Sequence, residues 1–210
     1  MTDEMQNQWN ERFSSEEYIY GKEPNTFLKE FFENNQKLFK NPVLMLGDGE
    51  GRNGVYLATK GMDVVSLDYA ANGLKKAELL AKEKNVKIKT ILANVNEFDF
   101  GVNQWGSIVL IYLHLSKIER LNLYEKIKNS LIPSGLFFVE AFSKNQLNYN
   151  SGGPKNYDLL YDKYELENAF KNQNGFEFEI ILSEEKVVIL HEGRFHEGEG
   201  SVVRFVSKKI

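Results

Sequence analysis

The chain has 210 residues, of which 42% are apolar and 13% aromatic, so it carries enough material for the core of one α/β domain. Its formal net charge of -4 argues against nucleic acid as a partner, and the lack of cysteine excludes disulfides, thiolate zinc sites and cysteine nucleophiles. No apolar run approaches the length of a membrane span and the polar N-terminus does not match a secretory signal, so we expect a cytoplasmic protein that does not enter the membrane.

The first forty residues differ in pattern from the rest of the chain. Their first recognisable unit is aromatic and irregular, with Trp9, Phe13, Tyr18 and Tyr20. A helix is predicted from about Pro24, because the apolar residues that follow it fall on one helical face. We expect residues 1–40 to form an arm and a helix that cover the ligand cleft of a single domain spanning residues 1–210.

Strands and helices alternate from residue 43 onward. The run Val43-Leu44-Met45-Leu46 is wholly apolar, which is typical of a strand covered on both faces. Further strands are predicted over residues 63–67, ending at Asp68, and then over 87–93, 107–113 and 136–142. Helices are predicted over residues 53–60 and 72–84, and from a capping box formed by Ser116 and Glu119.

The last third of the chain begins with a long polar segment, residues 143–158. A helix is predicted to start near Asp162, and two strands follow, over residues 176–190 and 201–207. Because no helix separates these two strands, they are expected to pair as an antiparallel hairpin. The pattern predicts the α/β fold class, with one open sheet of seven strands, mostly parallel, and a C-terminal hairpin.

A glycine-rich turn follows the first strand of this predicted sheet. Gly47, Gly49 and Gly51 allow a tight turn and close approach of a ligand at the N-terminus of the next helix. Asp68 ends the second strand, where an acid can accept hydrogen bonds from both hydroxyls of an adenosine ribose. Together they indicate an adenosine-containing ligand, although the glycines alone could serve only to make a tight turn.

Several pieces of sequence, in order, resemble one family. The chain is similar to class I S-adenosylmethionine-dependent methyltransferases, in a small bacterial branch related to tellurite-resistance and thiopurine methyltransferases. The matching pieces are Trp9 to Phe13, Tyr20 to Asn25, Gly47 to Asn53, Val64 to Asp68, Ala93-Asn94, His114-Leu115, Pro133 to Gly135 and Gly152 to Lys155. They cover nearly the whole chain.

The resemblance implies a Rossmann-like sheet and a set of site residues. S-adenosylmethionine is the implied cofactor, converted to S-adenosylhomocysteine, with its methionine part at the glycine loop, its ribose at Asp68 and its adenine between Asn94 and Val95. The implied cofactor-binding residues are Tyr20, Gly47, Asp48, Gly49, Gly51, Arg52, Asn53, Asp68, Tyr69, Asn94 and Val95. The catalytic candidates are Tyr112 and His114, after the fourth strand, and no metal is expected. The implied partner is a small-molecule methyl acceptor.

The chain departs from the family pattern at two positions. Many class I enzymes carry an acid where Met45 stands here, and many carry aspartate where Asn94 stands. Asn94 can still accept a hydrogen bond from the adenine amino group through its carbonyl oxygen. Asp48 or Glu50 could replace the acid that Met45 removes.

Two other functions remain open from the residues alone. The residues Gly49 to Gly54 also match the G-x-G-x-x-G pattern of NAD-dependent oxidoreductases, and a non-catalytic cofactor-binding protein would carry the same loop. His114 is as well suited to capping a helix as to catalysis. Glu140 is expected at a solvated strand end, and His191 and His196 are expected in a solvated hairpin loop.

Overall fold

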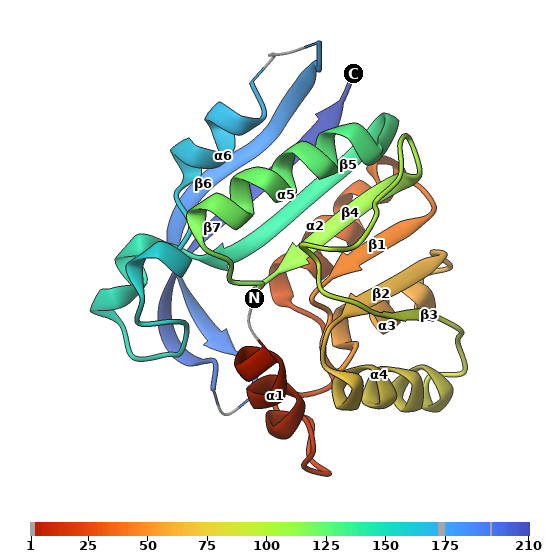
Figure 1. The fold of residues 1–210 in the computed structure, drawn as a ribbon, viewed down its shortest axis with the longest axis vertical. Coiled ribbons are helices and arrows are strands. Elements are labelled where there is room, and N and C mark those ends of the chain that lie inside the picture. The colour runs from red at the N-terminus through yellow and green to blue at the C-terminus, as the bar shows by residue number, and fades with distance from the viewer. Residues whose placement is uncertain (1–2, 172–174, 194) are drawn as a thin grey trace.

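The structure is a computed structural model that describes residues 3–171, 175–193 and 195–210, and these build one seven-stranded sheet (Figure 1). Its strands are β1 (Val43–Leu46), β2 (Val64–Asp68), β3 (Lys89–Leu92), β4 (Trp105–Ile111), β5 (Leu131–Phe142), β6 (Phe178–His191) and β7 (Glu197–Lys209). The strand order is β3-β2-β1-β4-β5-β7-β6, and β7 runs antiparallel to both its neighbours. The predicted mostly parallel sheet with a C-terminal hairpin is confirmed.

Helices lie on both faces of this sheet (Figure 1). They are α1 (Asp3–Arg12), α2 (Thr26–Asn35), α3 (Arg52–Thr59), α4 (Ala71–Glu83), α5 (Lys117–Ser130) and α6 (Lys163–Ala169), with short 3-10 turns at Gln36–Leu38, Lys144–Asn148 and Tyr157–Leu159. The predicted capping box is present at α5, where the Ser116 side chain and the Glu119 side chain each bond the other residue's backbone N–H.

Alternate side chains of the central strands feed two separate cores. Leu44 and Leu46 of β1 pack in the core that α5 and α6 cover, whereas Val43 and Met45 pack in the core that α2 and α3 cover. Successive side chains of a strand point to opposite faces, so a strand with helices on both sides must be apolar throughout. This is why β1 carries no polar residue.

Several elements differ from the sequence-based prediction. Residues 3–12, expected to be irregular, form helix α1, whose polar residues gave no strong apolar stripe. The predicted alternation of strands and helices is broken after β3, where residues 93–104 connect to β4 without a helix. Strand β4 ends at Ile111, two residues before the predicted boundary, because Tyr112 turns the chain with a positive φ of 53°.

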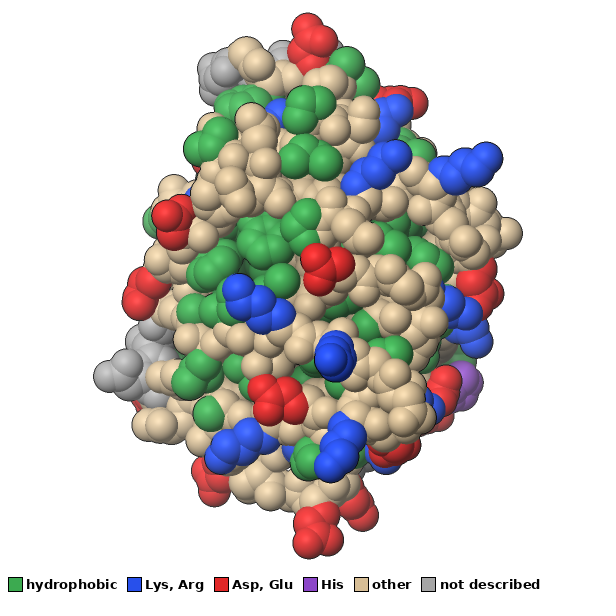
Figure 2. Space-filling view, turned by 90° about the vertical axis from the view of Figure 1, so that its right-hand side faces the viewer, with side chains coloured by type: hydrophobic (Ala, Val, Ile, Leu, Met, Phe, Trp, Pro, Cys, Tyr) green, Lys and Arg blue, Asp and Glu red, His purple; other side chains and the backbone are tan. Residues whose placement is uncertain are grey.

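The face at the β3 edge mixes charges of both signs. In Figure 2, basic and acidic side chains are interspersed on that face rather than gathered by sign, with apolar side chains between them. On the side shown, such a surface has no extended positive electrostatic potential that would attract a polyanion. Within the described ranges, every helix is too short or too polar to cross a membrane.

Candidate functional site

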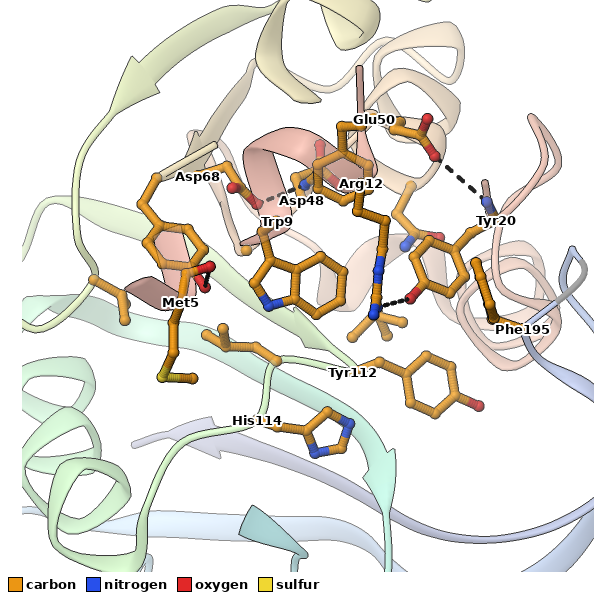
Figure 3. A pocket seen from close by; sticks show the side chains of 18 of the residues that line it. Met5, Trp9, Arg12, Tyr20, Asp48, Glu50, Asp68, Tyr112, His114 and Phe195 are labelled. Atoms are coloured by element: carbon orange, nitrogen blue, oxygen red, sulfur yellow. Dashed lines mark hydrogen bonds between the residues drawn. The ribbon is translucent and has the colours of Figure 1, made fainter. Parts of the chain in front are cut away.

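A cavity of about 430 Å³ opens where the carboxyl ends of β1, β2 and β4 meet (Figure 3). This is the edge at which open α/β sheets bind ligands. Eleven of the thirteen residues proposed from the sequence line it: Tyr20, Gly47, Asp48, Gly49, Arg52, Asn53, Asp68, Tyr69, Val95, Tyr112 and His114.

The glycine loop forms one wall of the cavity. Gly47 and Gly49 both have positive φ, at 63° and 55°, which side chains rarely tolerate. A Cβ at Gly47 would lie 2.9 Å from the Leu113 side chain, and one at Gly49 would lie 3.1 Å from Phe13. The loop is therefore closely packed on both sides and presents bare backbone to the cavity.

Asp68 joins the end of β2 to this loop. Its Oδ2 accepts a hydrogen bond from the Gly49 backbone N–H and its Oδ1 accepts one from Ala70, both at 2.8 Å. The side chain is only 5% exposed, and burial raises its pKa to about 6. Each carboxylate oxygen keeps a second acceptor position for a ligand hydroxyl.

Asp48 is a second buried acid in the same loop. It accepts hydrogen bonds from the Ser66 hydroxyl at 2.6 Å and from the Gly54 backbone N–H at 3.3 Å. Burial has the largest influence on the pKa of Asp48 and raises it to about 7. Its carboxyl group lies against β2 rather than in solvent, and its residue also lines the cavity.

Two of the expected contacts, Gly51 and Asn94, do not line the cavity. Gly51 precedes α3 and touches α4, since a Cβ there would lie 2.4 Å from the Ala77 Cβ. The Asn94 side chain instead accepts a hydrogen bond from the backbone N–H of Asn96 and so stabilises its own turn. Both positions serve local geometry in this structure.

The N-terminal arm covers the opening of the cavity. Met5, Gln8, Trp9 and Arg12 of α1 all contribute to the lining, as does Phe13. Figure 3 shows Trp9 and Arg12 reaching across the site from α1.

Glu50 anchors this arm, a role that the sequence did not reveal. Its Oε2 accepts a hydrogen bond from the Ile19 backbone N–H at 2.8 Å, and its Oε1 pairs with Lys76 of α4 at 2.5 Å. The glycine loop, the arm and α4 therefore meet at one carboxylate. Of the two acids considered as replacements for the acid missing at Met45, Glu50 contacts the arm and α4, whereas Asp48 contacts Ser66 of β2.

His114 lies in the segment that follows β4. Its Nδ1 is 3.1 Å from the carbonyl oxygen of Leu159, so Nδ1 carries the proton and donates it. Burial lowers the pKa of His114 to about 4, so the ring is neutral at physiological pH. Its Nε2 is enclosed and has no hydrogen-bond partner among the described residues.

Tyr112 and His196 form an aromatic wall beside His114. The His196 ring centre lies 4.6 Å from that of Tyr112 and 4.7 Å from that of Tyr20. The expected solvated loop is correct for His191, which is exposed, but wrong for His196, which is 6% exposed and lines the cavity. The tip of the β6–β7 hairpin folds inward over the sheet edge, which residue spacing alone could not indicate.

A buried polar network lies behind this wall. The Asn25 amide nitrogen donates to Glu140 Oε1 at 2.6 Å and to Glu192 Oε1 at 2.8 Å. Arg52 binds Glu192 at 2.7 Å. The Tyr112 hydroxyl donates to Glu140 at 2.9 Å. The expectation that Glu140 is solvated is wrong, because β7 and α2 enclose it.

This network connects the start of α2 with α3, β5, β7 and the β6–β7 hairpin. Arg204 neutralises Glu140, and Arg52 neutralises Glu192, so each buried carboxylate has a cation as well as an amide donor. The Asn53 side chain accepts from the Asn25 backbone N–H at 2.8 Å. In the described part of the chain, no three His, Asp or Glu side chains are grouped to hold a metal ion.

Solved methyltransferases share this fold. The structure of TehB from Haemophilus influenzae matches with a TM-score of 0.68 at 17% identity, over 98% of this chain and 67% of that one. Magnesium protoporphyrin IX methyltransferase from Synechocystis PCC 6803, solved with bound S-adenosylmethionine, matches with a TM-score of 0.66 at 14% identity, over 100% of this chain and 99% of that one. The fold is thus that of class I S-adenosylmethionine-dependent methyltransferases.

The sequence places the chain within one family of that class. The family model of the tellurite resistance protein TehB matches residues 13–206, and the chain belongs to this family. A probable S-adenosylmethionine-dependent methyltransferase TehB of Haemophilus influenzae (strain 10810) is 32% identical over 125 residues, 50% of this chain and 43% of the relative. A ubiquinone biosynthesis O-methyltransferase of Rickettsia akari (strain Hartford) is 26% identical over 122 residues, 56% and 47% of the two chains. The chain spans about half the length of these relatives.

Proposed function

We propose that this protein binds S-adenosylmethionine and transfers its methyl group to a small-molecule acceptor by in-line displacement. One observation carries the proposal. The glycine loop after β1, Asp68 at the end of β2 and His114 after β4 line a single cavity in a chain of the TehB family. A strand-end loop and an acid at this spacing suit an adenosine ligand, and the third strand end supplies a place for an acceptor.

The residues present fit this cofactor. The cavity volume falls within the range of small-molecule sites. Asp68 has lone pairs for two ribose hydroxyls. Tyr69 and Val95 also line the cavity and offer apolar surface for the adenine. Gly47 and Gly49 leave room for the methionine part to lie against backbone, since neither has a Cβ.

The sulfonium of the cofactor supplies a reactive methyl group, so the protein has to position the reactants rather than form a covalent bond. Helix α1 and the Tyr20 segment shield the cavity from water, which would otherwise surround the nucleophile. Tyr112 and His196 form the aromatic wall of the cavity and pack against Phe142, and Glu140 holds the Tyr112 hydroxyl in place. Burial and that carboxylate raise the pKa of Tyr112 well above its usual value, so its hydroxyl stays protonated.

His114 is the group that orients a protonated acceptor. With its proton fixed on Nδ1 by Leu159, its unpartnered Nε2 can only accept a hydrogen bond. A pKa of about 4 makes the imidazole a weak base near neutral pH. We therefore assign His114 to alignment of the nucleophile, with proton loss completed after methyl transfer.

The acceptor is proposed to be small because the cavity is covered. Helix α1 crosses one side and Gly152 to Pro154 line another, so a macromolecule would have to displace packed segments to reach His114. The negative net charge of -4 also disfavours a nucleic acid substrate.

The oxidoreductase alternative is less well supported. Dinucleotide-binding folds have a mostly parallel sheet with the strand order 3-2-1-4-5-6, whereas here the antiparallel β7 lies between β5 and β6. The family match favours the methyltransferase interpretation as well.

Calorimetry tests the proposal directly. We expect S-adenosylhomocysteine and S-adenosylmethionine to bind and NAD not to bind at matched concentrations. Incubation with methyl-labelled cofactor and a panel of thiols, phenols, amines and oxyanions should then show label in one acceptor class. NAD affinity equal to or above that for S-adenosylhomocysteine would overturn the proposal.

A further inference from the structure

Arg12 of α1 is a cation beside the cavity without an acidic partner in the described residues. Its guanidinium lies 4.4 Å from the centre of the Trp9 ring and 5.3 Å from that of Phe195. Its Nη1 donates to the Tyr20 hydroxyl at 3.3 Å. Figure 3 shows the side chain extending between Trp9 and Tyr20 into the site.

The other cations that the structure describes around this site are neutralised. Arg52 pairs with Glu192 at 2.7 Å, Lys76 pairs with Glu50 at 2.5 Å, and Arg204 pairs with Glu140 at 2.6 Å. The residues outside the described ranges include no aspartate or glutamate that could serve Arg12. Arg12 therefore stands out as a positive charge left for something that enters the cavity.

The surroundings of Arg12 also define what it can bind. Aromatic faces support the flat guanidinium, and its edge carries the N–H groups. Five N–H donors in a planar fork match the two oxygens of a carboxylate, and the Tyr20 hydroxyl beside them can donate a further hydrogen bond. A neutral ligand would leave the Arg12 guanidinium without a counter-charge.

We infer that Arg12, with Tyr20, forms a carboxylate-binding subsite inside the cavity. The inference rests on the proposed function and adds a ligand group to it. Two sources of the carboxylate share this chemistry: the methionine part of the cofactor, and an acidic group on the acceptor. In either case α1 closes over the cavity by binding a charge that the bound molecule brings.

Fluorescence from Trp9 can report on this subsite. The chain has two tryptophans, and Trp105 lies at the opposite end of β4, so Trp105→Phe leaves Trp9 as the single reporter beside Arg12. In this background we compare Arg12, Arg12→Gln and Arg12→Lys. Glu11→Gln, an exposed change on the same helix, is the matched control.

Three titrations separate the sources. The probes are S-adenosylhomocysteine, its decarboxylated analogue 5′-deoxy-5′-(3-aminopropylthio)adenosine, and sodium benzoate added to protein with and without S-adenosylhomocysteine. If the cofactor supplies the carboxylate, Arg12→Gln weakens S-adenosylhomocysteine at least tenfold and leaves the analogue unchanged. If the acceptor supplies it, Arg12→Gln abolishes the benzoate response and spares both adenosine probes. Arg12→Lys should retain part of the binding that Arg12→Gln loses, because lysine keeps the positive charge but not the planar set of N–H donors.

The inference is overturned if Arg12→Gln changes neither S-adenosylhomocysteine nor benzoate binding, or if it weakens S-adenosylhomocysteine and the analogue equally. Failure of the unaltered protein to bind either adenosine probe would instead refute the proposed function. The benzoate titration of cofactor-free protein would then still decide whether Arg12 binds a carboxylate.

Discussion

Two aspartates of the glycine loop region are held out of water at the point where a ligand would bind. Asp48 and Asp68 are 8% and 5% exposed, and burial raises the pKa of both. A folded-state pKa above the unfolded value means that folding favours the protonated form. The stabilisation that comes with protonation is complete below pH 4 and is lost as the pH rises through 6 and 7.

Asp48→Asn should therefore stabilise the protein, and more so at pH 8 than at pH 5. An amide can still accept from the Gly54 N–H and can donate to the Ser66 hydroxyl, without a buried charge. A pKa of about 7 corresponds to a gain of about 2–4 kcal/mol at pH 8. Thermal unfolding measures it, at about 2–4 °C per kcal/mol for this size. Equal effects at both pH values would contradict the assigned cause.

Asp68→Asn should weaken binding of S-adenosylhomocysteine by about tenfold to a hundredfold, since a charged acceptor for two hydroxyls is lost. The unaltered protein should bind more weakly as the pH falls below about 6, the pKa of Asp68, and the variant should lose that dependence. Asparagine is preferred to alanine because its carbonyl oxygen can keep one of the two backbone hydrogen bonds that Asp68 accepts, from Gly49 and from Ala70. Calorimetry from pH 5 to 8 decides, and a folded variant of unchanged affinity would exclude the ribose role.

For most of the residues that sequence reasoning located, the position follows from the strand pattern, whereas Tyr20 was indicated by the family resemblance. Asp68 and His114 directly follow predicted strands, so their edge of the sheet is known in advance. Asn25, Glu192 and His196 meet only because α2 and the hairpin converge on that edge from opposite ends of the chain. No local pattern encodes such a meeting, although Asn25 lies within the Tyr20 to Asn25 segment that resembles the family.

Helix α2 shows how an element can be fixed at its first residue. Asn25 caps the helix by accepting from the Leu28 N–H at 2.9 Å, while its amide nitrogen binds Glu140 of β5 and Glu192 of the hairpin. One side chain thus sets the start of a helix and its position against two strands. Helix α1 was not predicted because it carries no apolar stripe: its residues line the cavity and form hydrogen bonds with Tyr69 and Asn72.

Two substitutions at Asn25 should separate these roles. Asn25→Ser keeps a helix cap but leaves two carboxylates without an amide donor, at an expected cost of about 1–3 kcal/mol. Asn25→Asp keeps the cap but places a third acid beside Glu140 and Glu192, so it should destabilise more, and the difference should shrink at low pH. Urea unfolding at pH 5 and 8 measures both. If serine proves as harmful as aspartate, charge in the network is not the cause.

At the scale of the whole molecule, one sheet carries the cavity at its ligand edge, and segments that are far apart in the sequence cover that edge. The sheet could be predicted because its strands are apolar and regularly spaced. The sequence indicated a cover from residues 1–40, but not helix α1 or the inward-folded hairpin tip, because these owe their places to contacts with each other and with Gly152 to Pro154. A Cβ at Gly152, for example, would lie 2.1 Å from the Phe195 carbonyl oxygen.

Binding should tighten this cover. We expect S-adenosylhomocysteine to slow backbone hydrogen exchange in α1, residues 18–21 and residues 150–158, because these segments line the cavity from outside the sheet. Mass spectrometry with and without ligand measures the change, with α5, remote from the cavity, as internal control. Protection confined to the glycine loop and Asp68 would mean that the cover is already closed.

The antiparallel course of β7 separates the chain's C-terminus from the cavity. β7 starts at the hairpin tip beside the ligand edge and carries the chain to Lys209 at the opposite edge, as Figure 1 shows. A surface linker or fluorescent fusion joined after Ile210 would therefore leave the cavity entrance clear. The same fusion placed before α1 would sit on the cover itself, so immobilised binding assays with this protein should be anchored through its last strand.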